Sequence, residues 1–258
     1  MIIIRKISFF LFFLIQITES LKSQESLIFF DDFSNSSVDL NYWNYELGDG
    51  CPELCGWGNL ESQIYTKNNI LNKNNKLIIK ATKQDQTYFS GRLNTKGKIE
   101  FRYGIVEVRA KLPKGKGVWP AIWMLGFDID EIPWPACGEI DIMEYVGKNP
   151  SEIHTTVHTS DSYGDSKNTK VINLKNIEND FHIYSIDWNE NRINFLIDNN
   201  IVYRFSPDTK TDEIWPFDKP FYLILNLAIG GRFGGFEIDD SIFPQEFIID
   251  YVKVYKRN

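Results

Sequence analysis

Apolar and polar residues alternate along much of the chain, which is typical of β-strands with one buried face. No window long enough for a major helix shows a 3.6-residue period. Asp198, Asn199 and Asn200 predict a hairpin between two alternating segments, because Asn and Asp tolerate left-handed backbone conformations. The alternating segments are residues 99–103 and 105–110 on either side of Gly104, then 184–188, 193–197, 201–205 and 247–255, the last of which we expect to close a sandwich. The pattern predicts an all-β protein.

Segment 138–145 contains three carboxylates, Glu139, Asp141 and Glu144, with only apolar residues between them. Successive side chains of a strand point to opposite faces, so Glu139 and Asp141 share one face and the intervening isoleucines the other. Strict alternation would send Glu144 into the apolar layer, where an unpaired glutamate is costly. A one-residue bulge between Asp141 and Glu144 restores the pattern. We therefore expect all three acids to point into one cleft.

Crowded acids raise one another's pKa because like charges repel, so such a group holds both a proton and a negative charge. Cleavage of a glycosidic bond needs both: an acid for the leaving oxygen and a carboxylate at the anomeric carbon. The segment alone leaves two alternatives, an acidic edge strand and a calcium site of clustered oxygens.

The segment resembles the signature of glycoside hydrolase family 16 in its laminarinase-like form, which has one extra residue, here Met143, before the last Glu. The resemblance extends from about residue 30 to 255 through motifs in matching order: Trp57-Gly58-Asn59, residues 90–97, 117–124, 215–218 and 225–231. It implies a β-jelly-roll sandwich of two antiparallel sheets whose concave sheet holds the sugar chain. It also implies a retaining mechanism with Glu139 as nucleophile, Asp141 assisting it, and Glu144 as acid/base.

Tryptophans are the candidates for sugar stacking, because the apolar face of a pyranose packs well on an aromatic ring. Trp119 and Trp123 fall on one face by alternation, and the resemblance places both in the cleft. Trp134 lies in a proline-rich loop just before the acidic strand, where we expect its ring to form one side of the active site. Trp188 belongs to an alternating strand and is assigned to the core, whereas Trp43 fits either place.

Polar substrate-binding residues follow from the resemblance. Asn59, Arg92 and Asn226 match positions that hydrogen-bond sugar hydroxyls, and His158 matches one beside the acid/base glutamate. Ordinary hydrogen bonding within loops and turns is the alternative for these residues. Phe233 stands where many relatives carry Trp, which implies a reshaped subsite.

Metal binding is expected only at a structural site. The resemblance implies a calcium ion held by the Asp250 carboxylate and by backbone carbonyls near Asp32 and Asn75, although relatives usually have glycine in place of Asn75. No C-x-x-C or H-E-x-x-H pattern indicates a catalytic metal, so no cofactor is expected for catalysis.

The chain has three cysteines, so at least one is free. A bridge between Cys51 and Cys55 is sterically possible. Cys137 lies beside acids rather than the cationic groups that lower a thiol's pKa, which argues against a nucleophilic role.

Residues 1–23 read as a secretory signal peptide, because Arg5 and Lys6 precede an apolar run too short to span a bilayer. A membrane anchor or lipoprotein is the alternative.

Residues 24–258 are expected to form one catalytic domain, since about 235 residues suit a single sandwich. The net charge of −7, which becomes −9 without residues 1–23, argues against a nucleic-acid partner. We expect a monomer that is secreted or periplasmic.

These observations predict a secreted endo-β-1,3-glucanase that cuts internal bonds of laminarin-like glucans with retention of configuration. One alternative keeps the chemistry and changes the substrate to mixed-linkage glucan or to a galactan such as agar. The other is a β-glucan recognition protein without turnover. Both glutamates are present, which favours the enzyme.

Overall fold

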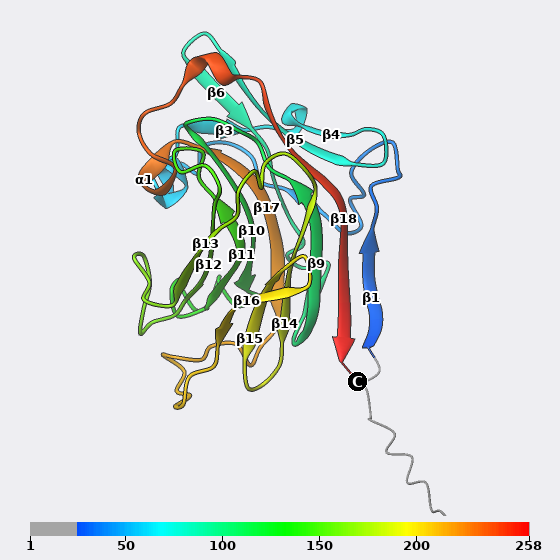
Figure 1. Ribbon diagram of the computed structural model, residues 1–258, viewed down its shortest axis with the longest axis vertical. Coiled ribbons are helices and arrows are strands. Elements are labelled where there is room, and N and C mark those ends of the chain that lie inside the picture. Colours follow the sequence, from blue (N-terminus) through cyan, green and yellow to red (C-terminus); the bar gives the residue numbers. More distant parts are fainter. Residues whose placement is uncertain (1–24, 258) are drawn as a thin grey trace, which may run out of the picture.

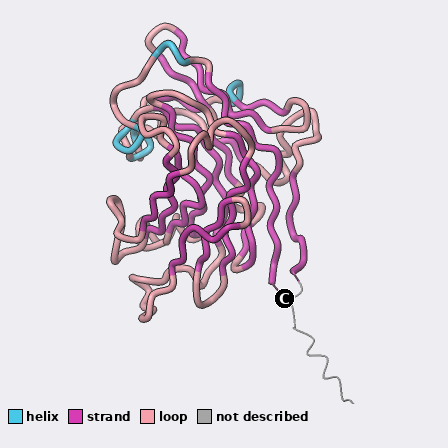
Figure 2. The backbone as a smooth tube through the Cα atoms, in the orientation of Figure 1, coloured by secondary structure: helices cyan, strands magenta, loops and turns pink. Residues whose placement is uncertain are grey.

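The computed structural model describes residues 25–257, which fold into two stacked β-sheets (Figures 1 and 2). The expected signal peptide lies outside the described residues. The 10-stranded sheet contains β1 (Glu25–Asp31), β3 (Gln63–Tyr65), β4 (Ile70–Asn72), β5 (Leu77–Gln84), β6 (Thr87–Ser90), β9 (Gly104–Lys111), β14 (His182–Trp188), β15 (Ile193–Ile197), β16 (Asn200–Phe205) and β18 (Gln245–Arg257).

The second, 8-stranded sheet carries the acidic segment in its middle. Its path runs β13-β12-β11-β10-β17-β7-β2, and β8 pairs with β17 off this path. Its strands are β2 (Asn44–Tyr45), β7 (Arg92–Asn94), β8 (Glu100–Phe101), β10 (Val118–Gly126), β11 (Glu139–Tyr145), β12 (Glu152–His158), β13 (Thr169–Asn173) and β17 (Phe221–Ile229).

Helical structure is minor in the described chain. It consists of α1 (Gly231–Gly234) and the short 3-10 turns η1 (Cys55–Gly58), η2 (Lys67–Asn69) and η3 (Asp240–Ile242). No helix among residues 25–257 has the length and apolar character needed to cross a bilayer. The all-β prediction is confirmed.

A single large apolar core fills the space between the sheets. Trp43 and Trp188 are fully buried in it, together with Phe195, Phe221 and Phe247. Full burial of each large apolar side chain contributes about 1.5–3 kcal/mol. The assignment of Trp188 to the core is confirmed, and Trp43, which the sequence left open, belongs to the core as well.

The predicted hairpin turn is also confirmed. Asp198 and Asn199 have positive φ angles of 49° and 64° in the hairpin between β15 and β16. Gly104 begins β9 with φ 120°, and a Cβ there would meet the Tyr255 carbonyl oxygen at 2.0 Å, so a side chain cannot be accommodated. Strand β18 does not lie at the edge of its sheet; it lies between β9 and β5 and also pairs with β1.

Candidate active site

Strand β11 contains the predicted bulge. Asp141 pairs with Thr156 of β12 and Glu144 pairs with His154, so three steps on β11 match two on β12. The register against β10 shifts at the same place. Because of the extra residue, Ile142 and Met143 both enter the core, and Glu144 returns to the face of the other two acids.

The three carboxylates are largely removed from water. Burial raises the pKa of Glu139, Asp141 and Glu144, and the negative charge of Asp141 raises the pKa of both glutamates further. Like charges this close cannot all ionise together. The group therefore retains protons at pH values where free carboxyl groups have lost theirs.

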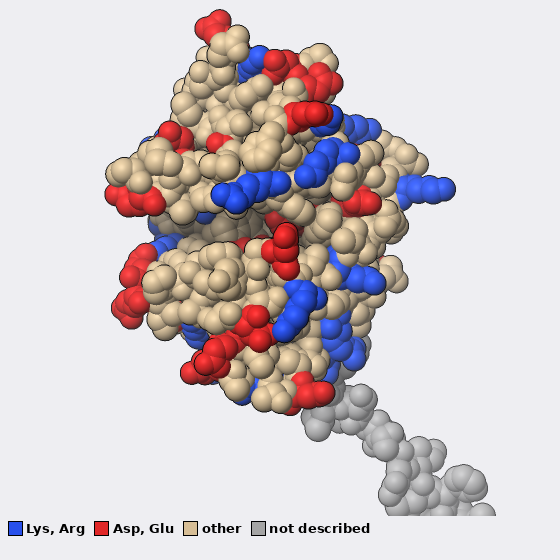
Figure 3. All heavy atoms as spheres, turned by 90° about the vertical axis from the view of Figure 1, so that its left-hand side faces the viewer, with Lys and Arg blue, Asp and Glu red and all other residues tan. Residues whose placement is uncertain are grey.

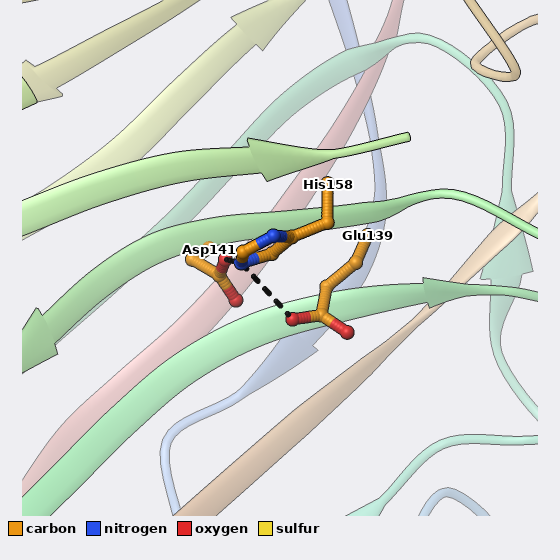
Figure 4. A group of neighbouring side chains, drawn as sticks. All are labelled: Glu139, Asp141 and His158. Carbon is orange, nitrogen blue, oxygen red and sulfur yellow. Dashed lines mark ion pairs between the residues drawn. The ribbon is translucent and has the colours of Figure 1, made fainter. Parts of the chain in front are cut away.

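His158 lies opposite Glu139 on β12 and faces two of the acids (Figure 4). Its Nε2 is 3.2 Å from Asp141 Oδ2 and 3.7 Å from Glu139 Oε1. Asp141 is 3% exposed, and its Oδ2 accepts no hydrogen bond. The structure thus places His158 beside Glu139 and Asp141, whereas the residue that pairs with Glu144 on β12 is His154.

Glu144 is held by an aromatic group. Trp119 Nε1 donates a hydrogen bond of 3.0 Å to Glu144 Oε1, which favours the ionised carboxylate and partly offsets the effect of burial on its pKa. The Trp119 ring packs edge-on against Phe233 at 5.4 Å, and Phe233 packs against His154 at 5.0 Å. The rings of Trp119, Phe233 and His154 therefore pack in a row beside Glu144.

Arg92 lies between two tryptophan rings. Its guanidinium carbon is 4.4 Å from the centre of Trp57 and 5.0 Å from that of Trp123. Its Nε donates to the Glu46 carboxylate. Arginine between aromatic faces is stabilised by cation–π attraction, and the ion pair with Glu46 orients the planar guanidinium group. The remaining guanidinium nitrogens can donate to a hydroxyl-rich ligand.

Asn59 and Asn226 belong to one hydrogen-bond network. Asn59 Nδ2 donates to Glu61 Oε1 at 3.3 Å, and the Tyr65 hydroxyl donates to Glu61 Oε2 at 3.2 Å. Asn226 Nδ2 donates to the Tyr65 hydroxyl at 3.2 Å, and Trp123 Nε1 donates to Asn226 Oδ1 at 2.7 Å. Burial raises the pKa of Glu61. The network fixes the orientation of both asparagines.

The predicted residues of this site extend across five neighbouring strands on one face of the 8-stranded sheet, β12, β11, β10, β17 and β7, except for Asn59 and Trp134, which lie in loops. Figure 3 shows this side of the molecule crossed by a groove. Trp134 is 42% exposed, with its ring 5.9 Å from His158 and 5.4 Å from Tyr163. A solvent-accessible aromatic wall next to buried acids is suited to binding and cleaving a sugar chain.

Sequence reasoning missed three contributors to this face: Glu46, Glu61 and Tyr163. Glu61 follows the Trp57-Gly58-Asn59 motif at a distance of two residues, which could have directed attention to it. Glu46 is 46 positions from Arg92, and no local pattern indicates that the two pair.

The cysteines do not contribute to the chemistry of this face. Cys51 and Cys55 form a disulfide in the loop that leads to Trp57. Cys137 is free and buried, and burial together with Glu139 raises the pKa of its thiol to about 12. A thiol with this pKa stays protonated near neutral pH, which agrees with the expectation that Cys137 is not a nucleophile.

The expected calcium site at Asp250 does not fit the structure. Asp250 Oδ1 is 2.6 Å from Lys76 Nζ, and Oδ2 is 2.5 Å from Arg109 Nη1. Calcium takes six to eight oxygen ligands and would be repelled by the two cations that already pair with this carboxylate. The Asp250 side chain therefore serves an ion-pair network here, and this carboxylate does not fit the calcium ion that the resemblance implies.

His182 is remote from this chemistry. Its Nδ1 is 2.7 Å from Asp198 Oδ2 at the start of the β14–β15 pair, in agreement with an ordinary surface role.

Comparisons with known proteins agree with this geometry. The family model described as glycosyl hydrolases family 16 matches residues 59–252, more than half of the chain. The beta-glucanase of Rhodothermus marinus is 41% identical over 248 residues, which are 89% of this chain and 85% of that protein.

Solved structures extend the likeness to the fold. The laminarinase from Flavobacterium sp. UMI-01 is 54% identical with a TM-score of 0.88, covering 90% of this chain and 100% of that one. The laminarinase catalytic domain from Thermotoga maritima MSB8 is 40% identical with a TM-score of 0.85, covering 91% and 99%. The predicted jelly-roll sandwich and glycoside hydrolase class are confirmed, and the chain belongs to glycosyl hydrolase family 16.

Proposed function

We propose that the chain is an endo-β-1,3-glucanase that cuts internal bonds of laminarin-like glucans with retention of configuration. The observation that carries the proposal is the bulged strand β11, which presents Glu139, Asp141 and Glu144 on one face of the groove. Crowded carboxyl groups with raised pKa values supply the acid and the carboxylate that glycoside cleavage needs. The relatives named beta-glucanase and laminarinase support the choice of substrate.

In this mechanism Glu139 attacks the anomeric carbon while Glu144 gives its proton to the leaving oxygen. The product of this step is a glycosyl-enzyme ester on Glu139. Glu144, now ionised, takes a proton from water, and the water oxygen displaces Glu139. Asp141 hydrogen-bonds the nucleophile and takes part in the pair's coupled titration. Trp119, by donating to Glu144, stabilises its ionised form between the two steps.

We propose that the groove positions the glucan through two kinds of contact. Trp119, Trp123 and Trp134 provide stacking surfaces, and Asn59, Arg92, Asn226 and His158 provide hydrogen bonds. We further propose that the protein acts as a monomer outside the cytoplasm; the disulfide between Cys51 and Cys55 supports an oxidising compartment.

The substrate is tested by product analysis on laminarin, lichenan, agarose and cellulose. We expect internal cleavage of laminarin to short oligosaccharides, much slower action on agarose and none on cellulose. Comparable turnover of agarose would show a galactanase. Binding of laminarin without release of reducing ends would show a recognition protein.

The catalytic roles are tested with azide and a glucoside that carries a good leaving group. In Glu144→Ala such a substrate needs no protonation, so the glycosyl-enzyme forms, and azide attacks it to give a β-glycosyl azide. In Glu139→Ala the nucleophile is missing, so azide attacks the opposite face and gives the α product. NMR distinguishes the two adducts, and the reverse pattern would exchange the assigned roles.

A further inference from the structure

Three side chains in the groove form a compact set of metal-ligand atoms. Among the described residues, Glu139, Asp141 and His158 are the one group of three or more such residues whose ligand atoms all lie within 4.8 Å of one another. Figure 4 shows the imidazole of His158 directed toward both carboxylates from the neighbouring strand. The rigid pairing of β11 with β12 holds this arrangement.

A second feature is that one carboxylate oxygen of this set has no hydrogen bond. Asp141 is 97% buried, yet its Oδ2 makes no hydrogen bond although it lies 3.2 Å from His158 Nε2. Leaving a buried acceptor unsatisfied is costly, and more so for a carboxylate. A cation between the three side chains would satisfy this oxygen.

The two distances from His158 fit a tetrahedral ion. Zinc binds histidine nitrogen and carboxylate oxygen at about 2.0–2.2 Å, which places neighbouring ligand atoms about 3.3–3.6 Å apart. The distances from His158 Nε2, 3.2 Å to Asp141 Oδ2 and 3.7 Å to Glu139 Oε1, lie close to this range. Three protein ligands leave a fourth position for water. Magnesium and calcium need more oxygen ligands than this set offers.

We propose that Glu139, Asp141 and His158 form an inhibitory site for a divalent transition metal, for which Zn²⁺ is the probe. An ion bound there occupies the carboxylate that must attack the anomeric carbon, and it adds a ligand sphere where the substrate ring must enter. The inhibition rests on the role proposed for Glu139. Binding of the metal does not, so binding and activity are measured separately.

Binding is tested by titration calorimetry of the metal-free protein with zinc chloride in a non-chelating buffer. We expect one site per chain. Because changes beyond the ligands themselves already cost about 10–100-fold in affinity, His158→Gln should weaken binding at least about tenfold. Asp141→Asn is a second variant with the same expectation, and circular dichroism checks the fold of both. The matched control is His182→Gln, which removes a histidine paired with a single carboxylate and should bind Zn²⁺ like the wild type.

Activity on laminarin is measured in the same series. We expect Zn²⁺ to inhibit the wild type and His182→Gln equally, EDTA to restore both, and Mg²⁺ to have no effect. Cys137→Ala should still be inhibited by Zn²⁺, because the proposed ligands do not include its thiol.

Loss of inhibition in Cys137→Ala would overturn the proposal, as would unweakened zinc binding in folded His158→Gln and Asp141→Asn. An anomalous zinc peak away from the three side chains in a soaked crystal would also overturn it. If the wild type binds Zn²⁺ as expected but does not cleave laminarin, the proposed function fails and the metal site stands.

Discussion

At the scale of single residues, the site depends on side chains that set the charge of their neighbours. In the proposed mechanism, Glu144 has to be protonated to act as an acid and ionised to act as a base. Burial favours its protonated form, and the hydrogen bond from Trp119 favours its ionised form. Trp119 thus moderates the pKa of Glu144, and we propose that its ring also stacks on the sugar.

Replacing Trp119 with Phe separates these two contributions. The ring remains but the hydrogen bond to Glu144 is lost, so the pKa of Glu144 should rise further. The acid then stays protonated to a higher pH, and the alkaline limb of the kcat/KM profile should move upward. Trp119→Ala should in addition weaken binding or turnover by about 1–3 kcal/mol through lost packing. An alkaline limb that moves downward in Trp119→Phe would contradict this account of the acid.

A second residue-scale prediction concerns Glu46, which we infer positions Arg92 rather than touching the reacting atoms. In Glu46→Gln the negative charge that orients the Arg92 guanidinium group is lost, while the size of the side chain is kept. We expect KM for laminarin to rise about 3–10-fold with kcat little changed, because the interaction lies away from the acids. Glu53→Gln is an exposed control on a nearby loop. A fall in kcat without a change in KM would place Glu46 in the chemistry instead.

At the scale of elements, the bulge in β11 decides which side chains reach the groove. Without the bulge, strict alternation of the same sequence would bury Glu144 and turn Met143 toward the groove. The structure instead buries both Ile142 and Met143, with exposures of 2% and 0%, and turns Glu144 outward. The extra residue therefore contributes to the core as well as to the site.

Deleting Met143 tests this double role. The remaining sequence alternates regularly, so Glu144 should stay on the face of Glu139, and some activity should persist at a reduced level. Loss of one buried apolar side chain should lower the free energy of unfolding by about 1.5–3 kcal/mol. Denaturant unfolding and laminarin hydrolysis measure the two effects. Complete loss of both fold and activity would mean that the bulge does more than restore alternation.

Much of this element-scale structure could be predicted because it is local. Period-two alternation predicted β14, β15 and β16, and the need to keep Glu144 out of the core predicted the bulge. Pairings between distant segments could not be predicted in this way. Glu46 meets Arg92, and Asn226 of β17 meets Tyr65 of β3, only because segments far apart in the sequence converge in the fold. Their residue types alone do not indicate which partner each selects.

At the scale of the whole molecule, the 10-stranded sheet supports the groove from behind and carries its own charge network. Asp250 lies where the register of β18 shifts against β9, and its carboxylate joins Arg109 of β9 to Lys76, which precedes β5. The ion pairs therefore tie three neighbouring strands together. The two cations pair with both oxygens of the carboxylate that the resemblance assigned to calcium.

Asp250→Asn should reveal this network through the pH dependence of stability. The Lys76 and Arg109 charges hold the pKa of Asp250 below its ordinary value. A carboxylate whose pKa is lower in the folded state stabilises the protein above its unfolded pKa of about 3.9, and this stabilisation is lost as the pH falls through the folded pKa. At neutral pH we expect the substitution to lower the free energy of unfolding by about 1 kcal/mol, less in high salt because the pairs are partly exposed. The difference from the wild type should shrink below about pH 4. Asp130→Asn, which removes a mostly exposed partner of Lys96, is the control and should have little effect at any pH.

Removal of metal tests the same carboxylate independently. Because both Asp250 oxygens are already paired with cations, EDTA should leave the melting temperature of the wild type unchanged. A fall in melting temperature that calcium reverses would show that Asp250 binds the ion after all.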